Sequence, residues 1–587
     1  AAPRRKSGIW IAVGVLVVLA VAGLFWSRRS KTGAVAAGAT KRIAVLPFEN
    51  LGAPQDDYFA DGIADQIRGK LTSVPGIVVI ARGSSTPYRK TTKTPQEIAK
   101  ELSANYLLTA TVRWEKGGGQ NRVQVNPELV EIVSDGPPQS KWQQPFDAAL
   151  TDVFQVQSDV ATKVAQALGA ALGARDEKRL AEKPTADLAA YDAFLKGDAA
   201  SNGLAANDVA TVRKALEFYE QAVALDPSFA EAWARIAVEC SLLYSNAVPT
   251  AEMADRAKQA AEKAIALAPG RPDPYLGLSY YQRMVVRDTA AAREACAKGL
   301  RLAPTDAILI SAGAAADLMA GQWEAALERA REAARLDPRS AQVVRRLGIV
   351  LLSLRRYAEA HEVIDRALAV APSNVFTNEM KAACFLGQGD LAAARSFLES
   401  ASSRVEPARL VAFTAQNEDL VWVFDEKQTA VLLRLTPDAF DDDRGIWGMV
   451  LAQAYALRGD SENMRVHADE ARQALEEQLR QTPNDPQRHA ILGLSLAYLG
   501  RKEEAIREGR RAVELLPVSK DAFLGPYLQH QLARIYIVVG EPEKALDQLE
   551  PLLKMPYALS PGWLKIDPNF DPIRSNPRFQ KLVAGGK

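Results

Sequence analysis

The chain has 587 residues, of which 48% are hydrophobic and 24% charged, a composition that excludes wholesale disorder. Three cysteines in this length exclude a scaffold stapled by disulfides. The net charge is +1, but residues 1–42 contain eight Lys or Arg and no acidic residue. The rest of the chain therefore has 64 basic and 71 acidic residues, and this slightly acidic balance argues against nucleic acid as a partner.

The first predicted element is an apolar helix over residues 9–26. This segment has no charge, amide or proline, and at 1.5 Å per residue it extends about 27 Å, close to the ~30 Å hydrocarbon core of a bilayer. Trp10 and Trp26 lie near its ends, where indole rings favour the interface. We expect Ile9–Trp26 to be a single transmembrane helix, with a cleaved signal peptide as the alternative. Basic residues in the flanking segments 1–8 and 27–41 leave its orientation open.

Residues 42–173 are predicted to form a small α/β domain with a mixed sheet, because short apolar runs alternate with amphipathic stretches. The predicted elements are strands at 42–48, 77–80, 106–114 and 121–130, a further strand at Trp142, and helices at 58–71, 95–103 and 152–172. Gly117, Gly118 and Gly119 lie between two of these strands and indicate a hairpin turn.

Five segments of this domain resemble the TolB amino-terminal-like domain. They are Ile-Ala-Val-Leu-Pro-Phe-Glu-Asn-Leu at 43–51, Asp-Tyr-Phe-Ala-Asp-Gly-Ile at 57–63, Val-Ile-Ala-Arg at 79–82, Leu-Leu-Thr-Ala-Thr-Val-Arg at 107–113 and Leu-Thr-Asp-Val-Phe-Gln-Val-Gln at 150–157. Residues 131–140 depart from the family pattern. The resemblance implies the non-catalytic half of a bacterial receptor-like Ser/Thr kinase, nucleotide cyclase or membrane-bound transcription regulator. It carries over no catalytic residue.

A helix–turn–helix unit closed by proline recurs over residues 187–560, after a linker at 174–186. The small residue that opens each second helix recurs at Ala215, Ala257, Ala292, Ala326, Ala360, Ala394, Ala430, Met464, Ala505 and Ala545, and six of the nine steps are 34 to 36 residues. This is the length of the tetratricopeptide repeat (TPR). We predict an all-α TPR superhelix of nine to ten units, followed by a capping tail at 561–587.

Two of these units match the repeat poorly. The unit at Ala430 carries Trp422, Phe424 and the acidic run 438–443, and the unit at Met464 lacks the small residue. A break in the superhelix, a partner site and ordinary repeat decay are all consistent with this pattern.

No motif for catalysis, metal binding or cofactor binding is present. The sequence lacks a phosphate-binding glycine loop, the kinase motifs His-Arg-Asp and Asp-Phe-Gly, and a serine nucleophile elbow. The four histidines and three cysteines lie in the repeats without metal-ligand spacing, so we expect packing roles and free thiols. We expect no enzymatic activity, metal or cofactor in these residues, and any kinase domain would lie upstream of residue 1.

The first helices of stacked repeats should line a concave groove that binds an extended peptide or a helix of another protein. Repeat register places Gln342, Arg345 and Ile349 on this face in the fifth unit, and Phe376 and Glu379 in the sixth.

Two functions fit this order of segments. In the first, the chain is the sensor and scaffold part of a bacterial signalling protein of the inner membrane, with residues 42–587 outside the cytoplasm. In the second, it is a stand-alone anchored TPR scaffold that assembles a membrane or envelope complex. The first is favoured, and sequence upstream of Ala1 would separate them.

Overall fold

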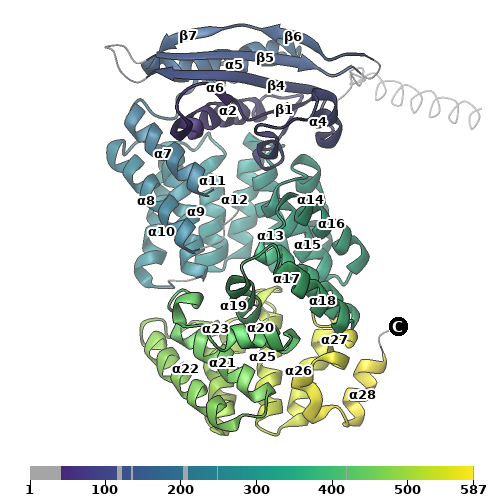
Figure 1. The fold of residues 1–587 in the computed structure, drawn as a ribbon. Coiled ribbons are helices and arrows are strands. Elements are labelled where there is room, and N and C mark those ends of the chain that lie inside the picture. The colour runs from purple at the N-terminus through teal and green to yellow at the C-terminus, as the bar shows by residue number, and fades with distance from the viewer. Residues whose placement is uncertain are drawn as a thin grey trace, which may run out of the picture.

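The computed structural model describes residues 41–115, 122–133, 136–201, 209–246, 249–417 and 419–585. Its N-terminal part is a small mixed sheet with helices, and the rest is an array of paired helices (Figure 1). The array turns back on itself, because helices near its C-terminal end share one hydrophobic core with helices of its middle.

The sheet has seven strands in the order β3-β1-β4-β5-β6, with β2 beside β4 and β7 beside β5. The strands are β1 (Lys41–Val45), β2 (Glu49–Asn50), β3 (Ile77–Ile80), β4 (Tyr106–Glu115), β5 (Arg122–Glu131), β6 (Gln139–Gln143) and β7 (Phe146–Ala149). β1 runs parallel to β3 and β4, whereas β4 and β5 are antiparallel. In β5, Val123 and Val125 are buried while Arg122 and Gln124 are exposed, so one face of this hairpin packs on the core and the other faces solvent.

Helices cover both faces of the parallel part of the sheet. They are α2 (Asp57–Thr72), α3 (Arg82–Ser85), α4 (Pro95–Leu102), α5 (Val153–Ala167) and α6 (Ala174–Ala181). Ile43 and Val45 of β1 share a core with α2 and α5, whereas Ala44 shares one with α4. This alternation follows from the two-residue period of a strand.

The strands and helices expected between residues 42 and 172 are confirmed, with end points that differ by a few residues. β2, β7, α3 and α6 were not expected, and α6 lies within the segment taken as a linker. The atypical stretch before Trp142 coincides with a register shift of β5 against β6 at Leu129 and Val130. The glycine turn at 117–119 lies outside the described residues.

The array begins at residue 188. Its helices are α7 (Leu188–Ser201), α8 (Val209–Leu225), α9 (Ala230–Asn246), α10 (Ala251–Leu267), α11 (Asp273–Tyr280), α12 (Thr289–Leu302), α13 (Ala307–Met319), α14 (Trp323–Leu336), α15 (Ala341–Ser353), α16 (Tyr357–Val370), α17 (Val375–Gln388), α18 (Leu391–Ala401), α19 (Pro407–Asn417), α20 (Glu426–Leu432), α21 (Arg444–Leu457), α22 (Ser461–Gln481), α23 (Pro486–Tyr498), α24 (Lys502–Leu515), α25 (Leu524–Val538), α26 (Pro542–Lys554), α27 (Pro561–Ile566) and α28 (Pro577–Ala584). α11 continues directly into a π-helical turn at Tyr281–Val286.

The small residues of the repeat period are buried where paired helices meet. Eight of the ten positions, all except Ala430 and Met464, have no exposed side-chain surface. Ala430 is exposed on the seven-residue helix α20, and α22 buries Ala468 in place of Met464. Trp422 is buried against Trp563 of α27, with ring centroids 6.2 Å apart. The irregular units therefore mark a break in the repeat, at which the C-terminal tail packs.

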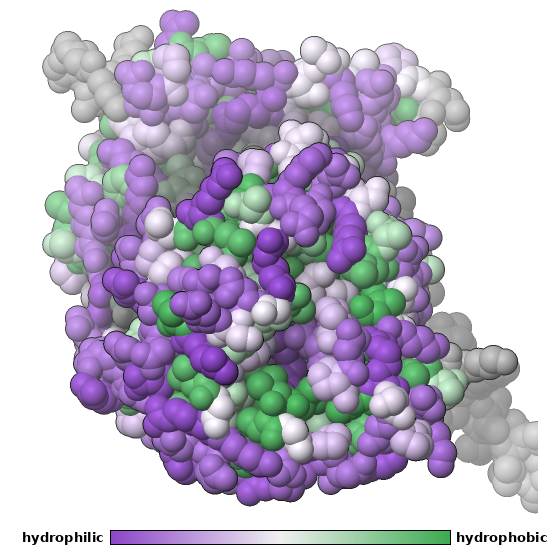
Figure 2. All heavy atoms as spheres, turned by 60° about the horizontal axis from the view of Figure 1, so that its bottom comes forward, coloured by the Kyte–Doolittle hydropathy of each residue, from purple (hydrophilic) through white to green (hydrophobic). Residues whose placement is uncertain are grey.

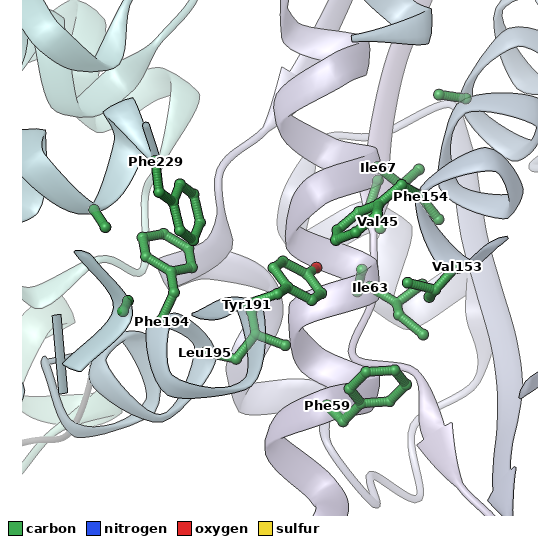
Figure 3. Close-up of a cluster of buried hydrophobic side chains, with 14 of the residues drawn as sticks. Val45, Phe59, Ile63, Ile67, Val153, Phe154, Tyr191, Phe194, Leu195 and Phe229 are labelled. Carbon is green, nitrogen blue, oxygen red and sulfur yellow. The ribbon is translucent and has the colours of Figure 1, made fainter. Parts of the chain in front are cut away.

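The sheet domain is joined to the first repeats by a continuous hydrophobic core. Ile63 of α2 and Phe154 of α5 meet Tyr191 of α7, and the Phe154 and Tyr191 rings lie 4.8 Å apart (Figure 3). α2 and α7 approach so closely that a Cβ added at Gly62 would lie 2.4 Å from Leu195 Cδ2. A larger residue at Gly62 would separate the two helices.

The sheet domain also touches the array at a second place, which we name the Ser84 contact (Ser84, Asp337 and Arg339). The Ser84 hydroxyl donates to the carboxylate of Asp337, at the turn between α14 and α15, and accepts from the backbone N–H of Arg339 at 2.8 Å. The Arg339 guanidinium donates to the Tyr88 hydroxyl and to Glu101, each at 2.8 Å. The sheet domain therefore reaches from α7 to α15 along the array.

The C-terminal helices close the array against its middle. The backbone N–H of Ala522 donates to the carbonyl of Met319 on α13, and Ser560 Oγ donates to the carbonyl of Gly387 on α17. The Arg355 guanidinium donates to the carbonyls of Leu552 and Leu559. The predicted capping tail therefore also packs on the middle repeats.

The structure corrects the predicted fold class and localisation. We expected a single transmembrane helix at residues 9–26 and an inner-membrane location. None of the helices in the described ranges is both long and apolar enough to cross a bilayer. α22, for example, has 21 residues but carries charged side chains along its length. Residues 9–26 lie outside the described residues. The fold is a mostly helical repeat superhelix with a small N-terminal mixed sheet, and a single-pass location is not supported.

A substitution at Gly83 tests the Ser84 contact, because a Cβ at position 83 would lie 2.6 Å from Ser340 Cβ and 2.9 Å from Ser340 Cα. We expect Gly83→Ala to lower the free energy of unfolding by about 1–3 kcal/mol, the usual cost of overpacking. Urea denaturation measures this change.

Gly69→Ala is the matched control, since Gly69 is exposed on α2 and has no atom within 4 Å of the added Cβ. It should stabilise by about 0.5–1 kcal/mol through helix propensity. Equal stabilisation by both variants would contradict the close packing at Gly83.

Candidate binding surface inside the helical array

The predicted groove residues fall into two groups. Gln342 is exposed, and Arg345 and Phe376 are partly buried, with the Arg345 guanidinium 4.9 Å from the centre of the Phe376 ring. These three side chains lie on a surface that solvent reaches. Ile349 and Glu379 are 8% and 3% exposed and belong to the interior. The structure therefore brings part of the predicted set together, on the first helices of two neighbouring repeats.

Sequence analysis missed two residues from α11 and its π-helical turn. The Gln342 side chain donates to the Tyr280 hydroxyl at 3.1 Å, although α13 separates α11 from α15 in the repeat order. Arg283 lies over the Tyr280 ring at 5.0 Å and is 7% exposed. The inner curvature of the array is thus tight enough for α11 and α15 to meet.

Arg346 completes a set that we name the arginine cluster (Arg283, Arg345 and Arg346). Its Nε is shielded from solvent and has no hydrogen-bond partner in the described part of the chain. Burial lowers the pKa of all three guanidinium groups. For Arg346 the charges of Arg283 and Arg345 add to burial and lower the pKa to about 9. Arg283 is buried, whereas Arg345 and Arg346 are partly exposed, so solvent screens part of the repulsion between these charges.

The other two arginines that are buried in the described residues, Arg68 and Arg534, have carboxylate partners. Arg68 pairs with Asp65, and Arg534 pairs with Asp419 at 3.2 Å. Burial acts to lower the pKa of Arg534, but Asp419 together with Tyr498, Asp567 and Tyr527 outweighs it and the pKa is raised. No member of the arginine cluster has an ion pair with a carboxylate in the described ranges. Arg283 therefore differs from the other buried arginines, because it has no carboxylate partner in this part of the chain.

A second polar set, the Asp419 network (Asp419, Gln453, Gln531 and Arg534), lies where the array closes. Asp419 accepts from Gln531 at 2.6 Å and from Gln453 at 3.3 Å. Arg534, which is 4% exposed, also donates to the side-chain oxygens of Gln453 and Gln531. Each of these groups is satisfied by another, so this network has a structural role.

The remaining titratable groups offer little chemistry in the described residues. No group of three His, Cys, Asp or Glu is placed to hold a metal ion there. Cys240, Cys296 and Cys384 are free and buried, as expected. Burial raises the pKa of Cys240 and Cys384 to about 12, so these thiols are poor nucleophiles. His489 is buried and bonds Glu508 at 2.7 Å, which is a packing role.

Hydrophobic side chains on the face seen in Figure 2 occur in separate patches between hydrophilic ones. This pattern differs from the continuous apolar band that a docked amphipathic helix would need. The polar surface of α11 and α15, where Gln342 bonds Tyr280, is a separate candidate for partner binding.

Comparison with known proteins identifies the helical array. Family models described as tetratricopeptide repeat match residues 317–377 and 351–404. Residues 317–404 of the array are therefore TPR repeats, whose stacked units form a protein-interaction scaffold.

Two curated relatives align with part of the chain. The putative adenylate cyclase 3 of Rhizobium meliloti (strain 1021) is 32% identical over 201 residues, 34% of this chain and 32% of that protein. The small glutamine-rich TPR-containing protein 2 of Mycosarcoma maydis is 37% identical over 91 residues, 16% of this chain and 26% of that protein. The chain thus spans about a third of the first relative and a quarter of the second.

Solved structures that align with part of the chain include a thermophilic TPR protein of Thermus thermophilus, at 18% identity and a TM-score of 0.29, covering 34% of this chain and all of that one. The pilF protein of Pseudomonas aeruginosa aligns at 15% identity and a TM-score of 0.26, covering 42% of this chain and 92% of that one.

We expect a substitution in the Asp419 network to lower the stability of the protein strongly. Asp419→Ala would leave the buried charge of Arg534 unpaired, and we expect it to lower the free energy of unfolding by about 3–5 kcal/mol. Urea denaturation followed by tryptophan fluorescence measures the loss.

Asp419→Asn is the matched control for this change. Asn keeps one acceptor oxygen and tolerates the left-handed backbone of this position, where φ is 53°. It should lose clearly less stability than Asp419→Ala. An alanine variant as stable as wild type would show that the network does not hold the array closed.

Proposed function

We propose that this chain is the non-catalytic, partner-binding part of a bacterial signalling protein. The observation that carries the proposal is the 32% identity to a putative adenylate cyclase over 201 residues, together with the TPR array. The absence of kinase, phosphate-loop and nucleophile-elbow motifs from the sequence supports a regulatory role for these residues. We also propose that the sheet domain is a TolB amino-terminal-like domain, on the basis of its motifs.

In this proposal the partner is a protein segment that binds the inner surface of the array. Gln342 and Tyr280 offer polar groups for hydrogen bonds to a peptide backbone, and Arg345 offers a charge held over Phe376. The sheet domain is joined to the same repeats by the α7 core and the Ser84 contact. A change of curvature on binding would therefore act on the position of the sheet.

Affinity capture from the native organism tests the binding surface. We expect Arg345→Glu to reduce partner recovery at least tenfold, about 1.4 kcal/mol of binding free energy, because the reversed charge lies at the centre of the surface. Quantitative mass spectrometry of the captured proteins gives the ratio.

Arg480→Glu is the matched control. Arg480 lies on α22, with 73% of its side chain exposed, and pairs locally with Glu477. Recovery should be unchanged in this variant. Equal recovery with Arg345→Glu and wild type would remove the α15 surface as the binding site.

The intact mass of the native protein tests the signalling role. A mass well above 63.7 kDa would indicate a further module, whose activity is then assayed with and without the captured partner. A mass equal to this chain would favour a stand-alone TPR scaffold.

A further inference from the structure

The first helices of the middle repeats are buried on every side, unlike the second helices. Residues 377–384 of α17 and residues 347–353 of α15 are buried without interruption. Each run extends around the whole helix, because one turn takes 3.6 residues. The second helix α16 buries a single stripe, which is Ala360, Val363, Ile364 and Ala367. First helices line the inner surface of a repeat superhelix, so part of that surface is covered here.

One part of this cover is a segment near the C-terminus, which we name the tail segment (residues 555–567). Residues 555–560 leave α26 without forming a helix or strand, and α27 follows. The Arg355 guanidinium donates to the carbonyls of Leu552 at 3.2 Å and Leu553 at 3.0 Å, in the last turn of α26, and to that of Leu559 at 2.8 Å. Arg355 therefore marks the point where the tail segment leaves the last repeat.

The motif Ser-Pro-Gly-Trp at 560–563 makes the contact with α17. Ser560 Oγ donates to the carbonyl of Gly387 at 2.6 Å. A Cβ added at Gly562 would lie 2.9 Å from the same carbonyl oxygen and 3.0 Å from the backbone nitrogen of Gly389. These atoms belong to the backbone and cannot turn aside as a side chain would. The contact therefore selects a hydroxyl group at the first position of the motif and glycine at the third.

Trp563 anchors the motif in an apolar place, but the packing behind it is incomplete. The Trp563 side chain is 4% exposed, and its ring meets that of Trp422 at 6.2 Å with the planes at 63°. A cavity of about 10 Å³, room for about one water molecule, lies between the tail segment and α25. It is lined by Tyr527, His530, Tyr557, Ala558, Leu559 and Trp563. Atoms beside a cavity lose dispersion contacts, so the tail segment is held less tightly than the core of the repeats.

We propose that Arg355, Gly387, Gly389 and Trp422 form a peptide-binding site, which the tail segment closes until a partner segment with the Ser-Pro-Gly-Trp pattern replaces it. The contacts are of the kind that hold a bound peptide. Hydrogen bonds to the main chain supply affinity, and the places for the hydroxyl, glycine and indole groups supply specificity.

The site continues the surface to which we assign partner binding. Arg345 and Phe376 lie in the N-terminal parts of α15 and α17, and the tail segment covers the C-terminal ends of the same two helices. Displacement of the tail segment would lengthen the open inner surface along both helices. This regulatory role rests on the proposed function, whereas the site is measurable without a partner. Peptide binding without partner capture would overturn the proposed function alone.

The test measures the fluorescence polarisation of a labelled peptide of residues 555–567 with the full chain. The tethered tail segment has an effective concentration of the order of millimolar, so wild type should bind the peptide weakly. Gly562→Ala should bind it at least tenfold more tightly, because the added Cβ displaces the tethered segment from Gly387. Gly69→Ala, whose Cβ meets no atom within 4 Å, should bind as wild type. A peptide that carries Gly562→Ala should bind the Gly562→Ala chain at least tenfold more weakly than the natural peptide.

Hydrogen exchange of wild type tests the same site without a substitution. The amides of α27 should open at a lower free energy than those of α23, because the tail segment detaches while the repeats stay folded. Opening of both helices at one common free energy would show that the tail segment is an inseparable part of the array and would overturn the proposal. Equal peptide binding by wild type and Gly562→Ala, or equal binding of the two peptides, would overturn it as well.

Discussion

The attachment of the sheet domain at two distant places fixes the curvature of the first five repeats. At one end Phe154 packs on Tyr191 of α7, and at the other Ser84 bonds Asp337 at the turn before α15. The sheet is rigid because its strands are cross-linked by backbone hydrogen bonds, so the span between these two places is set. A repeat array alone bends easily, since each unit contacts only its neighbours. Here the bend is held, and it is tight enough for Gln342 to reach Tyr280.

The C-terminal repeats hold the opposite side of the array. Their contacts with α13 and α17 and the Asp419 network close the superhelix into a compact body. Closure buries polar groups, and it is stable only where they are paired. The Asp419 network meets this condition within the protein, because the Asp419 carboxylate pairs with the Arg534 guanidinium at 3.2 Å.

Local patterns predicted most of the secondary structure because periodicity directly reports burial. The 34-residue period succeeded because a small residue such as Ala360 must fit where two helices meet. The repeat register also predicted that Gln342, Arg345 and Phe376 lie on one face of the array, and all three are at least partly exposed there. The predicted membrane helix was wrong as a description of the fold, since hydropathy records the apolar character of residues 9–26 and nothing about their place in the fold.

Long-range contacts left no local trace in the sequence. Nothing in the neighbourhood of Ser84 points to Asp337, 253 residues away. Arg283 was missed because it lies in the π-helical turn, which changes the number of residues per turn and breaks the repeat register that located Arg345. Tyr280 lies on α11, a repeat for which no groove residue was predicted. Two adjacent arginines, Arg345 and Arg346, in an otherwise apolar helix were the one available signal for the cluster.

The most direct measurement is small-angle X-ray scattering of wild type, Gly83→Ala and Gly69→Ala. A Cβ at Gly83 disturbs the Ser84 contact, whereas a Cβ at Gly69 meets no atom within 4 Å. If the sheet domain holds the curvature of the first repeats, Gly83→Ala should have a larger radius of gyration than wild type, while Gly69→Ala scatters as wild type. Equal radii of gyration in all three proteins would show that the array holds its curvature without the sheet and would contradict the account.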